Sequence, residues 1–389
     1  MPTFRKLLSG DIRLGEPLRY SVYDEHGTLL LRAGFVVTMP AQLDRLVGKG
    51  CFVDLAQVEE ANKFGTRTHP PVAVAVEAPP PTFSLADILC TGLKSLYLQL
   101  LRIPEQTDAT TVAGDIAKSI QRAGARDASG LIAALHIESN VPYLIGQQMM
   151  GAVLVDRVGS LSGVGNEERI SLISAALTRD LGMVELQLEL DKITGPLPDA
   201  VMARVRGHPE KAITILKKAG VRDPVWLEAI HQHHERIDGS GYPRGLGAEQ
   251  FDKGARLLSI CDMFSAMIKP RPYRQQGKAR LAQSALREIF TMGGKMLDPM
   301  YAALLVKVVG VVPPGSLVKL KSGEIAIVKD PVSNPKAATV YAIYSKHQLP
   351  MMEPVARDTS HPENEIVGMA LHSECRSAQL IMKRIWMKG

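Results

Sequence analysis

Aromatic residues, cysteines and long apolar runs are all scarce in this 389-residue sequence. The cysteines are widely scattered and form no Cys-x-x-Cys pair, which argues against a disulfide framework and favours a reducing compartment. The N-terminal stretch MPTFRKLLSGDIRLG contains too short an apolar run for a signal peptide. No uncharged stretch of about 18 apolar residues occurs, so we expect no membrane span and a cytoplasmic location. The four cysteines are Cys51, Cys90, Cys261 and Cys375.

The charge of the chain is mildly basic and is not concentrated. The formal net charge is +6, and no dense run of lysine and arginine with interleaved aromatic residues occurs. We therefore expect no nucleic-acid partner, whereas an anionic small ligand is compatible with this charge. Hydrophobic residues make up 46% of the chain, which is ordinary for a globular core. Because aromatics contribute only 5%, Ala, Leu, Val and Met fill the apolar positions, and this favours a mainly α-helical fold.

The sequence divides into four parts, in keeping with a length that suggests two or three domains. Residues 1–55 are predicted to form a small β-rich module, with short strands around a turn at 24–27. Residues 56–83 are predicted to be a linker, because THPPVAVAVEAPPP is rich in proline. Residues 84–312 show helical spacing of apolar residues, with Ser84 as the expected N-cap of the first helix. Residues 313–389 are predicted to form a β-containing cap, with two strands around Ser322-Gly323 and a third at 339–344.

The densest cluster of functional residue types is HHERIDGSGYP at 233–243. Two adjacent histidines and two acids, Glu235 and Asp238, precede a Gly-Ser-Gly-Tyr-Pro loop. The run at 225–230 has helical spacing, so the histidines are expected near a helix C-terminus, where the glycines then break the helix. Imidazoles beside carboxylates are suitable ligands for first-row metals. The simpler alternative is a polar helix end followed by a turn.

Four further polar positions lie inside or beside apolar helical runs. They are Asp180 in RDLG, His208 in GHPEKA, Asp262 in ICDMFSAM, and the cationic segment KPRPYR at 269–274. Taken singly, each is more simply read as an exposed or hydrogen-bonded residue. Buried polar groups need partners, however, and a shared metal ion would partner several of them at once.

The order and context of these motifs over residues 130–312 resemble the HD-GYP family, a helical HD-superfamily fold associated with hydrolysis of the bacterial second messenger cyclic di-GMP. HHERIDGSGYPRGL is close to the family signature, and GHPEKA and CDMFSAMIKPRPYR match in type and order. The hairpin module and the C-terminal strands also look like β segments that flank this domain in relatives. The resemblance implies a centre of two or three ions, commonly iron or manganese, and a metal-bound water that attacks phosphorus.

Carried over by position, the resemblance assigns a role to individual residues. His208, His233, His234 and Asp262 match metal ligands, and Asp180 matches the aspartate of the HD pair, a ligand and catalytic residue. Gly241, Tyr242 and Pro243 would line the ligand pocket. Arg271 and Arg274 would meet phosphate.

The sequence departs from the family on the HD side of the site. Arg179 stands where the family has the metal-binding histidine, and Met183 stands where it has a lysine near the substrate phosphate. A further family histidine is replaced by Gln147 or Gln148. Arginine carries only donors and cannot ligate a metal, although it can pair with Asp180 or with a ligand phosphate.

Three functions are compatible with this pattern. The first is a degenerate HD-GYP protein with absent or weak phosphodiesterase activity, acting as a receptor for cyclic di-GMP or a related nucleotide, or as a module that contacts a signalling protein through the GYP loop. The second is an active phosphodiesterase with a reduced site that holds one divalent ion, iron or manganese. The third is a metal-free scaffold whose pocket is collapsed around an ion pair of Arg179 with Asp180 or Asp262.

Overall fold

The structure is a computed structural model in which the chain forms two compact units, Met1–Pro79 and Pro80–Gly389. In the first unit it describes residues 4–8, 11–12, 18–27, 29–31, 33, 46–48, 50–55 and 58. In the second it describes residues 80–137, 141–193, 195–268, 281–371, 375 and 379–387. Most of the predicted linker lies outside the described residues.

The first unit contains a small antiparallel sheet with the strand order β1-β4-β2-β3. Its strands are β1 (Phe4–Lys6), β2 (Val22–Tyr23), β3 (Leu29–Leu31) and β4 (Phe52–Asp54). β2 and β3 pair across the predicted turn, where the Gly27 N–H donates to the Asp24 carbonyl. Gly27 has φ +78°, a conformation that suits glycine at such a turn.

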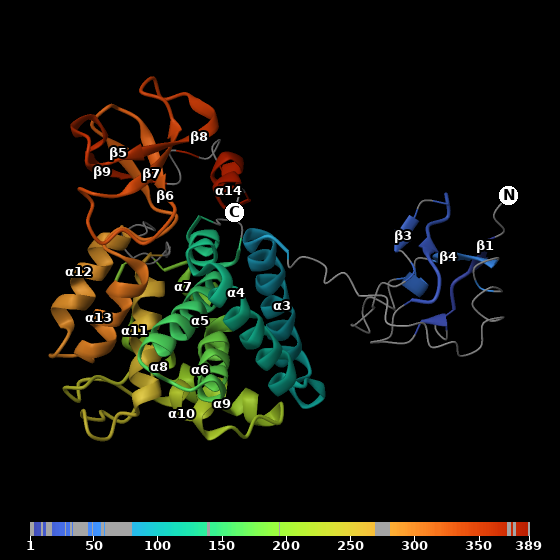
Figure 1. The fold of residues 1–389 in the computed structure, drawn as a ribbon. Coiled ribbons are helices and arrows are strands. Elements are labelled where there is room, and N and C mark those ends of the chain that lie inside the picture. Colours follow the sequence, from blue (N-terminus) through green and yellow to red (C-terminus); the bar gives the residue numbers. More distant parts are fainter. Residues whose placement is uncertain are drawn as a thin grey trace. The chain divides into compact units, whose positions relative to one another are not determined.

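The second unit is a helical body joined to a C-terminal sheet (Figure 1). Its fold is mainly α, as the sequence predicts. The helices of the body are α3 (Thr82–Arg102), α4 (Ala109–Ile137), α5 (Tyr143–Leu161), α6 (Asn166–Thr178), α7 (Val184–Leu190), α8 (Asp199–Arg206), α9 (His208–Lys218), α10 (Pro224–Gln232), α11 (Lys253–Ile268), α12 (Ala282–Met292) and α13 (Pro299–Val309). None of the described helices is both long and apolar enough to cross a membrane.

The prediction that Ser84 caps the first helix is wrong. α3 begins at Thr82, and Pro81 is its N-cap residue, because the Pro81 carbonyl accepts the first helical hydrogen bond, from Leu85. Pro81 has φ −51° and ψ 144°, outside the helical region, so the helix starts directly after it.

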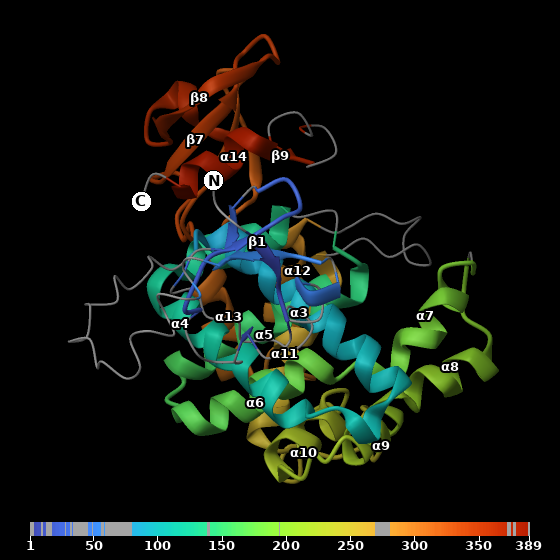
Figure 2. The same ribbon diagram turned by 90° about the vertical axis from the view of Figure 1, so that its right-hand side faces the viewer.

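Helix α5 lies at the centre of the body and positions the site. It is apolar on nearly all sides, with 14 of its 19 residues buried, and it packs against α4, α6 and α11 (Figures 1 and 2). A helix that is apolar all round belongs inside a protein rather than at its surface. Three polar side chains of α5 are buried and must find partners. They are Gln147, Gln148 and Asp156.

The C-terminal sheet has the antiparallel order β8-β7-β6-β5-β9. Its strands are β5 (Leu317–Leu320), β6 (Ile325–Val328), β7 (Thr339–Tyr344), β8 (Pro350–Asp358) and β9 (Ile366–Ala370), and α14 (Gln379–Met387) packs beside β8. The three predicted strands are present as β5, β6 and β7. β8, β9 and α14 were not predicted, because charge and proline interrupt their apolar alternation.

The helical body and the sheet share one hydrophobic core. Leu317, Ile325 and Ile327 belong to the core of the helices, whereas the alternate residues Val318, Ala326 and Val328 form a separate apolar cluster on the other face of the sheet. Strands buried on both faces are typical of an integral layer rather than of an appended surface element.

Candidate functional site

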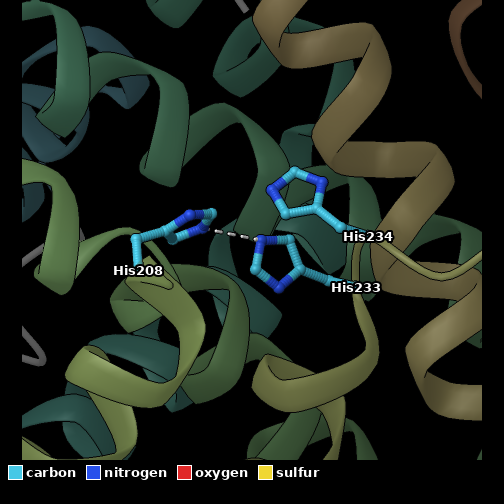
Figure 3. Close-up of side chains that lie close together, drawn as sticks. All are labelled: His208, His233 and His234. Atoms are coloured by element: carbon cyan, nitrogen blue, oxygen red, sulfur yellow. Dashed lines mark hydrogen bonds between the residues drawn. The ribbon is translucent and has the colours of Figure 1, made fainter. Parts of the chain in front are cut away.

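Three histidines converge at one point of the helical body (Figure 3). His208 is the first residue of α9, and His233 and His234 follow the last residue of α10, as the sequence predicts. Their ring nitrogens can be chosen so that one atom from each lies within 4.8 Å of the others. The Nε2 atoms of His208 and His233 are 3.4 Å apart. These distances suit three ligands of one ion.

The rings of His208 and His233 are fixed by backbone carbonyls. Nδ1 of His208 lies 2.5 Å from the Val205 carbonyl oxygen, and Nδ1 of His233 lies 2.6 Å from that of Ile230. In the neutral ring Nδ1 then carries the proton and donates it, which leaves Nε2 as an acceptor. In metal-binding histidines the ring nitrogen that does not bind the metal usually donates to such a carbonyl, which fixes the orientation of the ring.

Burial keeps His233 and His234 uncharged. It lowers the pKa of His233 to about 4, with a further contribution from His208. Burial also lowers the pKa of His234 well below its usual value, helped by the two neighbouring rings. At neutral pH these imidazoles are therefore free bases, which is the form that binds a metal.

Asp180 lies beside the cluster. Its Oδ1 is 3.2 Å from Nε2 of His208 and 4.0 Å from Nε2 of His233, and its Oδ2 accepts a hydrogen bond of 2.6 Å from Gln148. Burial alone would raise the pKa of Asp180, but the hydrogen bond with His208 and the charge of Arg179 hold that pKa well below its usual range. Asp180 is therefore an anion within reach of an ion held by the histidines.

Asp262 is engaged in a different way. Its Oδ1 accepts 2.8 Å from Nε of Arg179 and 3.0 Å from Nε2 of Gln147. The Arg179 side chain is fully buried and also donates to the Ala176 carbonyl and, at 3.4 Å, to Ser265. Burial alone would lower the pKa of Arg179, but the charges of Asp262 and Asp180 raise it, so the guanidinium stays protonated.

Glycine at position 151 makes room for this guanidinium. A Cβ there would lie 3.0 Å from both terminal nitrogens of Arg179. Such a contact is tighter than van der Waals packing allows, so a larger residue in α5 would displace the arginine. The Arg179 side chain therefore occupies a cavity that the fold provides for it.

The loop after the histidines is held by Glu235. This buried carboxylate accepts hydrogen bonds from the backbone N–H groups of Arg244, at 2.7 Å, and Leu246, at 2.9 Å. A Cβ at Gly241 would collide with the backbone of Glu235, so the tight turn requires glycine. The loop stacks Tyr242 on the His234 ring, with centroids 4.7 Å apart. Pro243 follows and is exposed.

Comparisons with known proteins agree with this arrangement. A match to the HD domain family covers residues 133–300. A cyclic di-GMP phosphodiesterase of Pseudomonas aeruginosa is 25% identical over 337 residues, which are 82% of this chain and 80% of that protein. The chain belongs to the HD-GYP family.

Among other HD-GYP relatives, the share of the relative's own length that is matched varies. A 3′3′-cGAMP-specific phosphodiesterase of Vibrio cholerae is 28% identical over 177 residues, which are 46% of this chain but only 38% of that protein. The solved structure of an HD-GYP-type protein from Bdellovibrio bacteriovorus has the same fold, with a TM-score of 0.51, 17% identity, and coverage of 79% of this chain and 99% of that one.

The structure brings together most of the residues singled out in the sequence. His208, His233 and His234 form the cluster, with Asp180 and Tyr242 against it. Asp262 faces Arg179 and Gln147 instead. Arg271 and Arg274 lie outside the described residues. The expected ion pair of Arg179 is present with Asp262.

Two arginines at the site were missed, and Met183 lies elsewhere than the resemblance implied. Met183 does not face the cluster but packs in an apolar group with Leu186 and Leu190. Arg206 lies over the Tyr242 ring, with its Cζ 6.0 Å from the centroid, and Arg236 is half-buried nearby. The closeness of both arginines in sequence to the histidines, 206 to 208 and 236 to 234, was a signal that could have found them.

The histidine cluster could hold one metal ion. Three imidazoles and the Asp180 carboxylate are available to one ion. The buried Oε1 atoms of Gln147 and Gln148 accept no hydrogen bond from the described residues. A second ion would need Asp262, whose Oδ1 is already bound to the permanent cation of Arg179.

Proposed function

We propose that this protein is a degenerate HD-GYP protein of bacterial cyclic di-GMP signalling, which binds cyclic di-GMP or a related cyclic dinucleotide and hydrolyses it weakly or not at all. The observation that carries the proposal is the fully buried Arg179 side chain, paired with Asp262 where relatives of the family are expected to hold a metal ion. The nucleotide ligand is supported by relatives named for cyclic di-GMP and 3′3′-cGAMP.

The chemical argument concerns the number of ions. In a two-metal site the ions stabilise both the attacking and the leaving oxygens of an in-line displacement. The Arg179 guanidinium neutralises Asp262 and so replaces the charge of one ion, but it cannot bind a water molecule as a Lewis acid or lower that water's pKa. The charge balance of the site is kept, while the source of the nucleophile is lost.

The remaining half of the site suits ligand binding. One divalent ion, iron or manganese, would be held by His208, His233 and His234, with Asp180 in reach, and when bound it would neutralise charge on a phosphate oxygen. The carbonyls of Val205 and Ile230 keep the rings oriented, and the stacked Tyr242 forms a wall beside them. A contact of the GYP loop with a signalling protein stays a prediction of the sequence.

One sample should decide the matter. Metal content by elemental analysis, cyclic di-GMP binding by calorimetry and hydrolysis with Mn²⁺ or Fe²⁺ supplied are measured on the same purified protein. We expect no more than one ion per chain, measurable binding, and hydrolysis far below the turnover of about 1–10³ s⁻¹ that is common among enzymes. Two ions per chain with turnover in that range would refute the proposal.

The variant Arg179→His sharpens this test. It returns an imidazole to the position and releases Asp262 from its ion pair. We expect its metal content to rise above that of the wild type and its hydrolysis of cyclic di-GMP to increase. Arg204→His is the matched control, because Arg204 is exposed and pairs with Glu189 at 2.6 Å. An Arg179→His variant that folds but gains neither metal nor activity would show that Arg179 is not what limits hydrolysis.

A second candidate is a phosphodiesterase that works with a single ion. The intact histidine cluster favours it, because neutral imidazoles with free Nε2 atoms are ready to bind. It predicts hydrolysis that requires one ion per chain and disappears in His234→Ala. The third candidate, a scaffold with a collapsed pocket, has the Arg179–Asp262 ion pair in its favour. It predicts that neither metal nor nucleotide binds.

A further inference from the structure

Two arginines beside the histidine cluster, Arg206 and Arg236, differ from Arg204, Arg244 and Arg256 in having no carboxylate within ion-pair distance among the described residues. Arg204 pairs with Glu189, Arg244 with Glu228 and Arg256 with Asp298, each within 3.3 Å. Among the residues that the structure describes, Arg206 makes neither an ion pair nor a hydrogen bond, and Arg236 only reaches the neutral hydroxyl of Ser259 at 3.4 Å. The charges of Arg206 and Arg236 are therefore not directly paired with a carboxylate.

Both arginines face the same aromatic side chain. Arg206 ends α8 and places its Cζ 6.0 Å from the Tyr242 ring centroid. The charges of Arg236 and Arg206 both act on the Tyr242 hydroxyl, and that of Arg236 also acts on His234. Tyr242 in turn stacks on His234. Arg206 therefore lies over the Tyr242 ring, and Arg236 lies close enough for its charge to act on both Tyr242 and His234.

The charges of the other groups at this place are already balanced. Arg179 neutralises Asp262, Asp180 lies against His208, and Glu235 accepts two backbone N–H groups. At Arg236, burial lowers the pKa, while the charges of Asp262 and then of the exposed Asp238 raise it; Asp262 is already paired with Arg179, and Oδ1 of Asp238 accepts hydrogen bonds from Ser240. A half-buried guanidinium without a bound anion bears a desolvation cost, and a phosphate group would repay it with charge-assisted hydrogen bonds.

We infer that Arg206 and Arg236 bind the phosphodiester groups of the nucleotide on the Tyr242 side of the site. This inference rests on the proposed function and adds to it the residues that recognise the ligand's charge. They take over the task of the family's phosphate-binding lysine, whose position is occupied by the buried Met183. Their planar donors suit two non-bridging phosphate oxygens, and Tyr242 offers an aromatic surface between them.

The experiment measures binding of cyclic di-GMP to the full-length protein by calorimetry. Arg206→Met keeps an apolar stem over Tyr242 but removes the charge, and Arg206→Lys keeps the charge. We expect Arg206→Met and Arg236→Met each to weaken binding about tenfold or more, since hydrogen bonds to charged groups are the strong ones. Arg206→Lys should recover part of the loss. The control Arg204→Met, from the same helix, should bind like the wild type.

Two further readouts separate ligand binding from support of the fold. The metal content of Arg206→Met should equal that of the wild type, and its affinity should depend less steeply on salt. The inference is overturned, while the proposed function stands, if the wild type binds and Arg206→Met binds equally well. It is also overturned if the variant loses its metal together with its affinity. A wild type that does not bind cyclic di-GMP refutes both. Because Arg206 is exposed, its variants keep the test decisive even if Arg236→Met does not fold.

Discussion

The two halves of the site differ in where their hydrogen bonds and charges end. On the histidine side, Nδ1 of His208 and of His233 is bound to a carbonyl, while their Nε2 atoms face each other and Asp180, where a metal ion could bind. On the arginine side, the charge of Arg179 and that of Asp262 are satisfied by each other and by Gln147 and Ala176. The first half is built to receive something, and the second is complete without it. A site can thus keep its electrostatic balance while it loses its chemistry.

The largest expected effect comes from breaking the arginine side. Arg179→Met removes the cation and leaves the Asp262 carboxylate buried without a countercharge. We expect the free energy of unfolding to fall by about 3–5 kcal/mol, because one partner of a buried pair is removed. Urea denaturation measures it. Arg204→Met is the control and should cost less than about 1 kcal/mol, since its ion pair is exposed. If Arg179→Met also lowered the free energy of unfolding by less than about 1 kcal/mol, the Arg179–Asp262 ion pair would not stabilise the fold.

The histidine side should respond to metal rather than to mutation alone. If one ion binds the folded protein, free metal at a hundredfold excess over Kd raises the free energy of unfolding by about 2.7 kcal/mol. Treatment with a chelator should remove this gain, and His234→Ala should show no gain at all. The control is His231→Ala. His231 lies in the last turn of α10, with its Nε2 3.9 Å from a carboxylate oxygen of Glu210, and its variant should behave like the wild type. Equal protection of the His231 and His234 variants would place the ion elsewhere.

A smaller effect is expected at Met183, which stands where the family resemblance implies a lysine. Because this residue packs with Leu186 and Leu190, Met183→Lys buries an ammonium group among apolar side chains. We expect a loss of roughly 1–3 kcal/mol in the free energy of unfolding and no gain in hydrolysis. The exposed Met300→Lys should change stability by less than about 0.5 kcal/mol. A Met183→Lys variant with unchanged stability and tighter nucleotide binding would contradict the packing argument.

Much of the fold followed from local patterns. Apolar spacing predicted the helical body, and the loop glycines predicted the end of α10 at the histidines. β8 could not be predicted, because its residues are mostly exposed and it therefore lacks the apolar–polar alternation that marks a half-buried strand. Likewise, the sequence separated the helices from the C-terminal strands because their texture differs, although the two share a core.

The site was predictable as a set of residues but not as a set of contacts. The motifs, read through their resemblance to the HD-GYP family, named the three histidines, Asp180 and Asp262. Whether Arg179 pairs with Asp180 or with Asp262 depends on the packing around its side chain, including Gly151 in α5. The spacing of motifs in the sequence does not show this packing. The partners of the two glutamines were equally hidden, since Gln147 and Gln148 are adjacent yet reach Asp262 and Asp180 on different sides of the helix.

The shared core of helices and sheet bears on which part of this chain can fold independently. The region that matches the HD domain family ends at residue 300, within α13, whereas the apolar core continues into Leu317, Ile325 and Ile327. A fragment cut at the family boundary would expose the helix faces that these strands cover and would tend to aggregate. The smallest autonomous folding unit is therefore set by the core and includes the sheet, so activity measured on a shorter fragment would report on a damaged site.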